Sequence, residues 1–152
     1  MIFRHILNLC LQFDQLSGVL LVEWVALSNP HYLRSSAEQL LALLREQEVR
    51  HLVLDMNSLP DLSVADQIWL GDYWMPGLVA LPLERLVLVI DSSRQHNQLA
   101  VDALHDLVQP AIRFSSHYFS DTASALDWLT DSSPRLLALA AEWAARYQPI
   151  AD

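Results

Sequence analysis

Two aspartates stand where an open α/β sheet would place reacting or binding groups. Asp55 ends an apolar run that begins at His51, and Asp91 ends a run that begins at Arg85. If both runs are parallel strands, their carboxyl ends meet at one edge of the sheet, where such sheets bind ligands. A histidine beside either carboxylate in a cleft would make a proton-transfer site. Aspartate is also a common turn residue that accepts hydrogen bonds from nearby amides, and this structural interpretation is favoured.

Other patterns that carry chemistry are missing from the sequence. The six histidines show neither a His-x-His nor a His-Glu-x-x-His spacing, and Cys10 is the single cysteine, so we expect no metal site and no internal disulfide. With three glycines, the chain has no glycine-rich phosphate loop and no Gly-x-Ser-x-Gly turn. All nine basic residues are arginine, which excludes Schiff-base chemistry at lysine. The sequence therefore favours a protein that is not an enzyme and holds no cofactor.

The composition is that of an acidic globular protein. The chain has 152 residues, of which 53% are hydrophobic and 18% charged, so a single domain over residues 1–152 with a substantial core is expected. The net charge of −9 argues against nucleic acid as a partner. There is no apolar run of a length that spans a membrane and no signal-peptide pattern, so a cytoplasmic location is expected.

The stretch from His51 to Gly77 organises the expected fold. Its first residues read as a short strand buried on both faces, because the run is continuously apolar. Ser63 is placed to cap a following helix, with Asp66 as its reciprocal capping partner. That helix is expected to end near Met75, because Pro76 disfavours helical geometry in the residue before it.

The same helix carries apolar residues on three adjoining faces. At helical spacing the three sets are Val64, Ile68, Gly71 and Met75; Leu70 and Trp74; and Trp69 and Tyr73. A helix that lies on a sheet needs an apolar face over about a third of its circumference. We therefore expect at least one of Trp69, Tyr73 and Trp74 to face a pocket, another element or a partner chain, although ordinary core packing would also account for them.

A second amphipathic helix is expected at the C-terminal end. Ser133 and Pro134 form a strong helix start, and the helix should run to about Tyr147. Its apolar stripe consists of Leu136, Ala140, Trp143 and Tyr147. The stripe either packs within the chain, as surface helices usually do, or joins the aromatic residues above in a partner surface that includes Trp143. A homodimer is the simplest such partner.

The remaining elements alternate between strands and helices. The expected strands are Leu9–Phe13, Val19–Ala26, Arg85–Ile90 and Ile112–Phe119, and the expected helix starts are a Ser35/Glu38 capping box, a Ser92/Gln95 capping box and an Asp121 cap. The first two strands form an antiparallel hairpin, and the later βα units imply parallel pairing. The fold class is therefore α/β: a single domain with a mixed sheet of about five strands, helices packed on it, and an extra C-terminal helix.

This order of elements resembles a known family. The features that carry the resemblance are the hairpin Leu9–Ala26, the strand His51–Asp55 with its turn, the helix with Trp69, Trp74 and Pro76, the strand Arg85–Ile90 and the helix Ala125–Leu129. Together they resemble the STAS domain, the fold of bacterial anti-sigma-factor antagonists, and most closely its SpoIIAA-like branch, which is grouped with CRAL-TRIO-like lipid-binding proteins. The resemblance covers roughly residues 3–130, and the extra helix within residues 131–152 lies beyond it.

The resemblance implies a regulatory or protein-interaction module without catalysis. In the family's antagonists a partner kinase phosphorylates a serine at the start of the helix after the third strand. Ser63 is the matching position, although it stands in the sequence Asp-Leu-Ser-Val rather than the family's Asp-Ser-Ser-Gly-like stretch. Ser63 is thus a candidate phosphorylation site, and a plain helix cap is the simpler interpretation of it.

Three functions follow, and structure can discriminate among them. A flat aromatic patch would favour the interaction module. A cavity lined by Trp69, Tyr73 or Trp74 would favour a carrier of a small apolar, lipid-like ligand. A histidine within hydrogen-bond reach of Asp55 or Asp91 in a cleft would favour an enzyme.

Overall fold

Five strands form one mixed sheet in the order in which they occur along the chain. They are β1 (Leu9–Asp14), β2 (Val19–Trp24), β3 (His51–Asp55), β4 (Arg85–Val89) and β5 (Ser115–Phe119). β1 and β2 form an antiparallel hairpin, and β2 to β5 run parallel to one another. The α/β fold with a leading hairpin is therefore confirmed. The computed structural model describes residues 6, 8–25 and 30–147, so the expected extension of the second strand to Ala26 lies outside the described residues.

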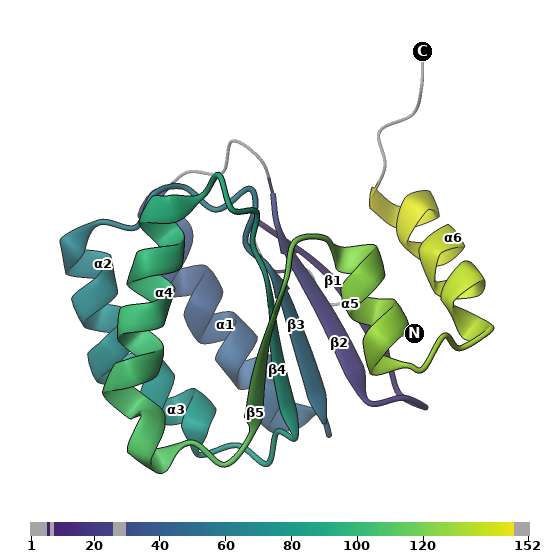
Figure 1. Cartoon of the computed structure of the whole chain (residues 1–152), viewed down its shortest axis with the longest axis horizontal. Coiled ribbons are helices and arrows are strands. Elements are labelled where there is room, and N and C mark those ends of the chain that lie inside the picture. Colours follow the sequence, from purple (N-terminus) through teal and green to yellow (C-terminus); the bar gives the residue numbers. More distant parts are fainter. Residues whose placement is uncertain (1–5, 7, 26–29, 148–152) are drawn as a thin grey trace.

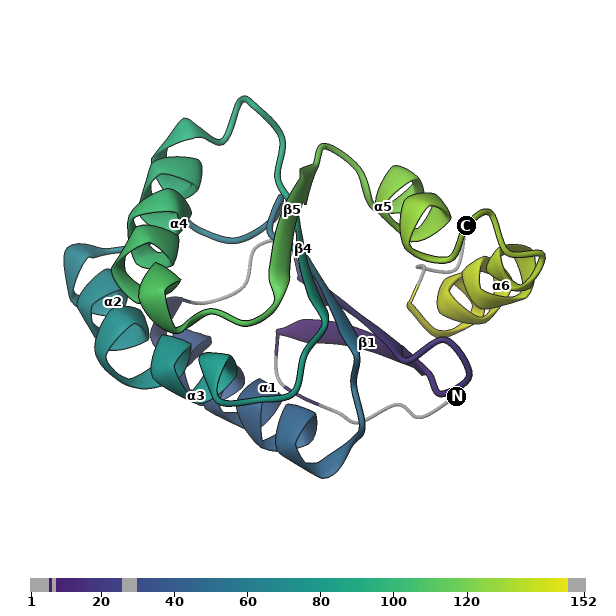
Figure 2. The same ribbon diagram turned by 60° about the horizontal axis from the view of Figure 1, so that its bottom comes forward.

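Helices cover the two faces of the sheet unequally. The helical segments are η1 (Pro30–Tyr32), α1 (Leu33–Glu46), α2 (Val64–Trp69), η2 (Leu70–Trp74), α3 (Met75–Val79), α4 (Gln95–Val108), η3 (Gln109–Ala111), α5 (Thr122–Leu129) and α6 (Arg135–Tyr147). Figure 1 and Figure 2 show α1 to α4 on one face and α5 with α6 on the other. The parallel strands follow one another across the sheet in chain order. Right-handed crossovers that all step in the same direction lie on the same face of the sheet.

The central strands are buried on both faces, as their continuous apolar sequences predict. Leu52 and Leu88 point into the larger core beneath α1 to α4. Val53 and Val87 point the other way, into a smaller core beneath α5. Successive side chains of a strand alternate between faces, so both sets must be apolar for the sheet to lose contact with water on each side.

The helix after β3 does not end at Met75, and that prediction was wrong. Residues 64–79 form one continuous helix in which α2 and α3 are joined by a π-helical turn, η2. The amide of Met75 donates to the carbonyl of Leu70, five residues earlier. The wider turn lets Pro76, which has no amide hydrogen, occupy the start of α3 without breaking the helix.

The π turn also changes which residues are buried. A turn that holds one residue more than a regular helix rotates everything after it by about 100°. Val64 and Ile68 are therefore 73% and 59% exposed, whereas Met75 is buried, although regular spacing placed all three on one stripe.

Helix starts follow the predictions in some places and not in others. Ser63 and Asp121 cap α2 and α5, accepting hydrogen bonds from the amides of Asp66 and Ser124. The capping box at Ser35 was wrong, because the turn η1 starts the helix earlier and Tyr32 is at the cap position. The one at Ser92 was also wrong: Arg94 occupies the cap position of α4 without a side-chain hydrogen bond.

The C-terminal helix α6 packs on the open edge of the sheet, beside β1. The hydroxyl of Tyr147 accepts from the amide of Leu11 at 3.0 Å and donates to the carbonyl of the same residue at 2.9 Å. The Gln12 side chain donates to the carbonyl of Leu139 at 2.9 Å. The two Tyr147 bonds satisfy the backbone groups of Leu11, which an edge strand otherwise leaves open to pairing with other chains.

An ion pair joins the first turn of α6 to the end of β1. A guanidinium nitrogen of Arg135 lies 2.7 Å from a carboxylate oxygen of Asp14. Burial of Asp14 opposes its ionisation, but the hydrogen bonds from Arg135 and Ser17 outweigh that effect and lower the pKa of the carboxyl. The pair is the charged part of the α6 contact.

We expect Arg135→Gln to lower the free energy of unfolding by about 1 kcal/mol near neutral pH, because it leaves the Asp14 carboxylate with fewer charged donors. The Asp14 pKa is lower in the folded than in the unfolded chain. The contribution is therefore present above the unfolded pKa of about 3.9 and is lost as pH falls through the folded value. Urea denaturation of wild type and variant from pH 7 to roughly pH 2 should show the gap closing in acid.

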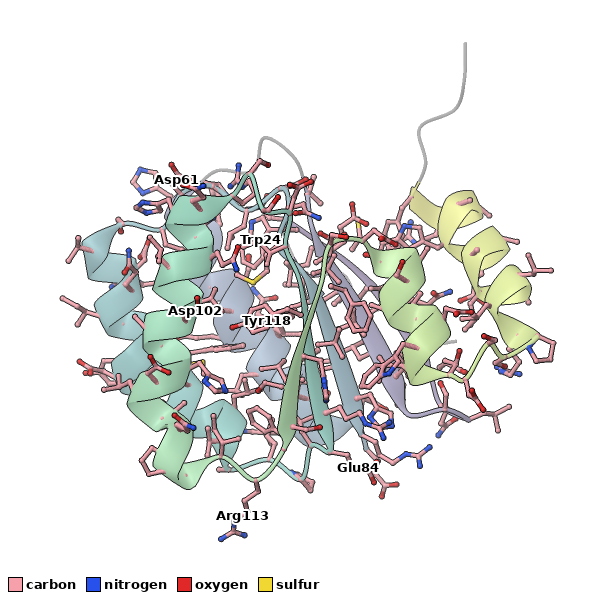
Figure 3. All side chains as sticks on the ribbon, viewed as in Figure 1. Trp24, Asp61, Glu84, Asp102, Arg113 and Tyr118 are labelled. Carbon is pink, nitrogen blue, oxygen red and sulfur yellow. The ribbon has the colours of Figure 1, made fainter. Side chains whose placement is uncertain are left out.

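The exposed Arg113, which points away from the fold in Figure 3, provides the control substitution Arg113→Gln. A gap between wild type and Arg135→Gln that persists in acid, or an equal gap for Arg113→Gln, would contradict this role for the ion pair.

Candidate functional site

An apolar cavity lies between the sheet and the helices of its larger core. Its volume is about 100 Å³. Val22, Leu54 and Leu88 supply part of its floor from the sheet, and Ala37 and Trp74 supply part of its wall from α1 and η2. Almost every lining side chain is aliphatic or aromatic, so a bound group would meet hydrocarbon rather than water.

Trp74 forms a fixed wall of this cavity. Its indole nitrogen donates to the carbonyl of Ala37 at 2.7 Å, and the side chain is buried. The hydrogen bond satisfies the one polar atom of the ring, so burial of the indole leaves no unpaired donor. The indole therefore fastens η2 to α1 beside the cavity.

Two glycines allow the helix to sit close to its neighbours. A Cβ atom added at Gly77 would lie 2.6 Å from Cδ2 of Leu41, which belongs to α1. One added at Gly71 would lie 3.0 Å from Cδ2 of Leu107 and 3.3 Å from Cδ2 of Leu104, both in α4. The backbone of this helix therefore lies close to side chains of both α1 and α4. The space between the helix and the sheet is the cavity.

Two polar residues lie among the lining residues of the cavity, Asp55 and His105. The carboxylate of Asp55 accepts from the amide of Asn57 at 3.1 Å and from the hydroxyl of Thr122 at 2.8 Å, so each oxygen has a partner. The His105 ring lies beside Asp106, with 3.9 Å between the nearest nitrogen and oxygen. The hydrogen bonds of the Asp55 carboxylate therefore stabilise the turn after β3 and connect it to the start of α5.

Asp91 is also a turn residue. Its carboxylate accepts from the amide of Ser93 at 2.9 Å, and this bond lowers the pKa of the carboxyl. Its own amide donates to the side chain of Asn57 at 2.6 Å. The two strand-end aspartates thus hold neighbouring turns together, which is the structural interpretation made from the sequence.

The four aromatic candidates separate in the structure. Trp74 lines the cavity. Trp69 is half-buried, with the guanidinium of Arg34 5.8 Å from its ring centre, and Tyr73 is 71% exposed. Trp143 packs within the chain, against the smaller core and the ring of Tyr147.

Trp24, which sequence reasoning missed, also lines the cavity. It ends β2 on the same side as Leu20 and Val22, which are buried in the larger core. Figure 3 shows it near the end of the strands where α4 begins. The alternation along β2 could have placed this tryptophan on the cavity side, because residues two apart share a face.

Ser63 is exposed at the start of α2 and accepts from the amide of Asp66 at 3.1 Å. The loop before it is fastened by Asn97, a fully buried residue of α4 that accepts from the amide of Leu62 and donates to the carbonyl of Leu59. The role of Ser63 as a helix cap is confirmed. Its exposure leaves the hydroxyl open to modification, and phosphorylation stays a prediction.

Comparison with protein-family models, with curated proteins and with solved structures finds no match to this chain. Among the described residues, no helix is long and apolar enough to cross a membrane. In the same part of the chain, no three histidine, cysteine, aspartate or glutamate side chains are grouped so that they could hold a metal ion.

Substitution at Ser63 should separate capping from charge. Ser63→Ala should lower the free energy of unfolding by about 1 kcal/mol, because the amide of Asp66 loses its acceptor. Ser63→Asp should leave stability near the wild-type value, because aspartate is an equally good cap. Urea denaturation measures both, and equal stability of all three proteins would show that the cap contributes nothing.

Proposed function

We propose that this protein is a non-catalytic binding module that takes a small apolar ligand, or the apolar end of a longer one, into the cavity beneath the π-helical turn. The observation that carries the proposal is the cavity itself, about 100 Å³ in volume and lined by Trp24, Trp74 and aliphatic side chains. Protein cores contain few voids larger than a water molecule. An empty volume of this size costs about 2 kcal/mol, so its retention by a native fold favours a use for it.

The size and lining of the cavity define the ligand. An apolar cavity of roughly 150 Å³ engineered into another protein stays dry and binds benzene or xenon. The present cavity would take a group of that kind or slightly smaller, such as xenon, a small ring or the end of an aliphatic chain. A ligand this small binds weakly, on the order of millimolar, unless part of it extends beyond the cavity.

The regulatory or interaction module of STAS type is the second candidate function. It is supported by apolar side chains that stay exposed on α2, η2 and α4. A homodimer through aromatic residues also stays a prediction, but Trp74 and Trp143 pack within the chain and so contribute less to it than expected. A protein that binds a ligand in its core can still present an outer face to a partner.

A cavity-filling variant tests the ligand site. Leu88 is buried and lines the cavity, so the extra ring atoms of Leu88→Phe should occupy the space and abolish the binding of benzene and xenon. Leu137→Phe adds the same atoms at a position on α6 that is 83% exposed, and it should bind like wild type. Tryptophan fluorescence reports binding directly because Trp24 and Trp74 line the cavity, and calorimetry gives the affinity.

If Leu88→Phe does not fold, Val101→Phe fills the same cavity from a half-buried position on α4. Wild-type protein that binds neither probe, or a folded filled variant that binds both as wild type does, would refute the proposal. Native mass spectrometry of protein purified from its own host then identifies the natural occupant and reports phosphate and oligomeric state in the same spectrum.

A further inference from the structure

Helix α2, which continues into η2, lies beside α4 in the helical layer. Both views show them side by side (Figures 1 and 2). Asn97 ties the start of α4 to the loop that precedes α2. Further along, Gly71 lies against Leu107, because a Cβ atom on the glycine would come within 3.0 Å of that side chain. The two helices are therefore joined at the loop before α2 and at Gly71.

Exposed apolar side chains lie on both helices. Val64 and Ile68 share one stripe of the first helix with Gly71, which faces α4, and Ala103 and Leu99 precede Leu107 by one and two turns in the second. We call Val64, Ile68, Leu99, Ala103 and Leu107 the α2/α4 surface. All five are exposed, with values of 73%, 59%, 70% and 63% for Val64, Ile68, Leu99 and Leu107. Exposed apolar residues that gather in this way mark an interaction site, whereas single ones need no explanation.

The charged side chains of the two helices are acidic, but two of them have partners elsewhere: Asp66 pairs with Arg34 at 3.0 Å, and Asp102 accepts from the hydroxyl of Tyr118 at 2.8 Å. Residues 64–79 and 95–108 include four aspartates, at positions 66, 72, 102 and 106, and no arginine or lysine. Asp72 is exposed, and the side chain of Asp106 is 80% exposed. A partner with basic residues beside its apolar contacts would therefore be attracted here. A second copy of this chain would bring the same aspartates and a net charge of −9 to the contact.

We propose that the α2/α4 surface is the docking site for an amphipathic helix of a partner protein, with apolar residues on one face and arginine or lysine along its flanks. Such a helix presents apolar side chains at positions i, i+3, i+4 and i+7 to the apolar surface of its partner. The apolar ridge of the partner covers Ile68 and Leu99, and its basic flanks lie beside Asp72 and Asp106. The site is separate from the cavity, so it does not rest on the ligand proposed above.

Designed peptides test the charge and the shape together. One fluorescent peptide of roughly 18 residues, about five helical turns, carries leucine at i, i+3, i+4 and i+7 with lysine on both flanks. A second keeps every leucine and replaces each lysine with glutamate. We expect the basic peptide to bind the full chain at least about tenfold more tightly in fluorescence anisotropy, with an affinity that falls as salt rises.

Substitutions on the surface locate the binding. Ile68→Asn and Leu99→Asn should each weaken binding of the basic peptide about tenfold, as expected for apolar residues at the centre of an interface. Both residues are exposed, so the fold should keep its melting temperature. Leu137→Asn, at an exposed leucine of α6, is the matched control and should bind like wild type. The cavity variant Leu88→Phe should also bind the peptide normally, which separates this test from that of the ligand.

Several results would overturn the proposal. Equal binding of the two peptides, or equal loss in Leu137→Asn, would show that the attraction is not specific to this surface. A dimer at about 100 μM in light scattering that Ile68→Asn and Leu99→Asn dissolve would assign the surface to a second copy. Co-sedimentation with phosphatidylcholine vesicles that both variants abolish would assign it to a membrane surface.

Discussion

The π-helical turn η2 is the constraint on which the binding features of this fold depend. It rotates the second half of the helix relative to the first, so that Met75 enters the core while Val64 and Ile68 stay outside. The indole of Trp74, bonded to the Ala37 carbonyl, fixes the rotated half against α1. The same turn therefore holds one wall of the cavity and leaves one wall of the α2/α4 surface exposed.

A regular helix could not serve both purposes with this sequence. Its single stripe would run through Val64, Ile68, Gly71 and Met75 and would bury all of them on the sheet. The aromatic residues would then exceed what contact with the sheet can bury, as the sequence pattern indicates. The extra residue in the turn resolves that surplus by dividing the stripe between the core and the surface, and Pro76 fits because the turn already departs from i→i−4 bonding.

The fold could be predicted largely from sequence because its strands carry strong local signals. The continuous apolar runs within His51–Asp55 and Arg85–Val89 require a layer of packed side chains on each face of the sheet. Caps were less certain, since serine is favoured at many positions near a helix start: Ser63 and Asp121 act as caps, whereas Ser35 lies inside α1. The turn η1 ahead of Leu33 does carry a signal, because it begins at Pro30 and proline is favoured at the first position of a helix.

The candidate site could not be derived in the same way. A cavity is a volume that no residue fills, and composition or periodicity does not report it. Trp74 was identified as a candidate because the helix had more aromatic surface than it needed, but its partner atom is a backbone carbonyl of α1, 37 residues away. The alternation along β2 places Trp24 on the same face as Leu20 and Val22, but only the packing of the helical layer shows that this face borders a cavity. Long-range packing, rather than local pattern, sets these positions.

The two faces of the sheet differ in the size of their cores and in the contacts of their helices. On the side of α5 and α6, the core is small and the contacts are specific: the Asp14–Arg135 ion pair and the Tyr147 hydroxyl hold a helix against an edge strand that would otherwise be open. On the other side, the core is large, and its helices border the apolar cavity and expose apolar side chains. The cavity and the exposed apolar side chains of this face cost stability, and such features are expected where a protein binds something.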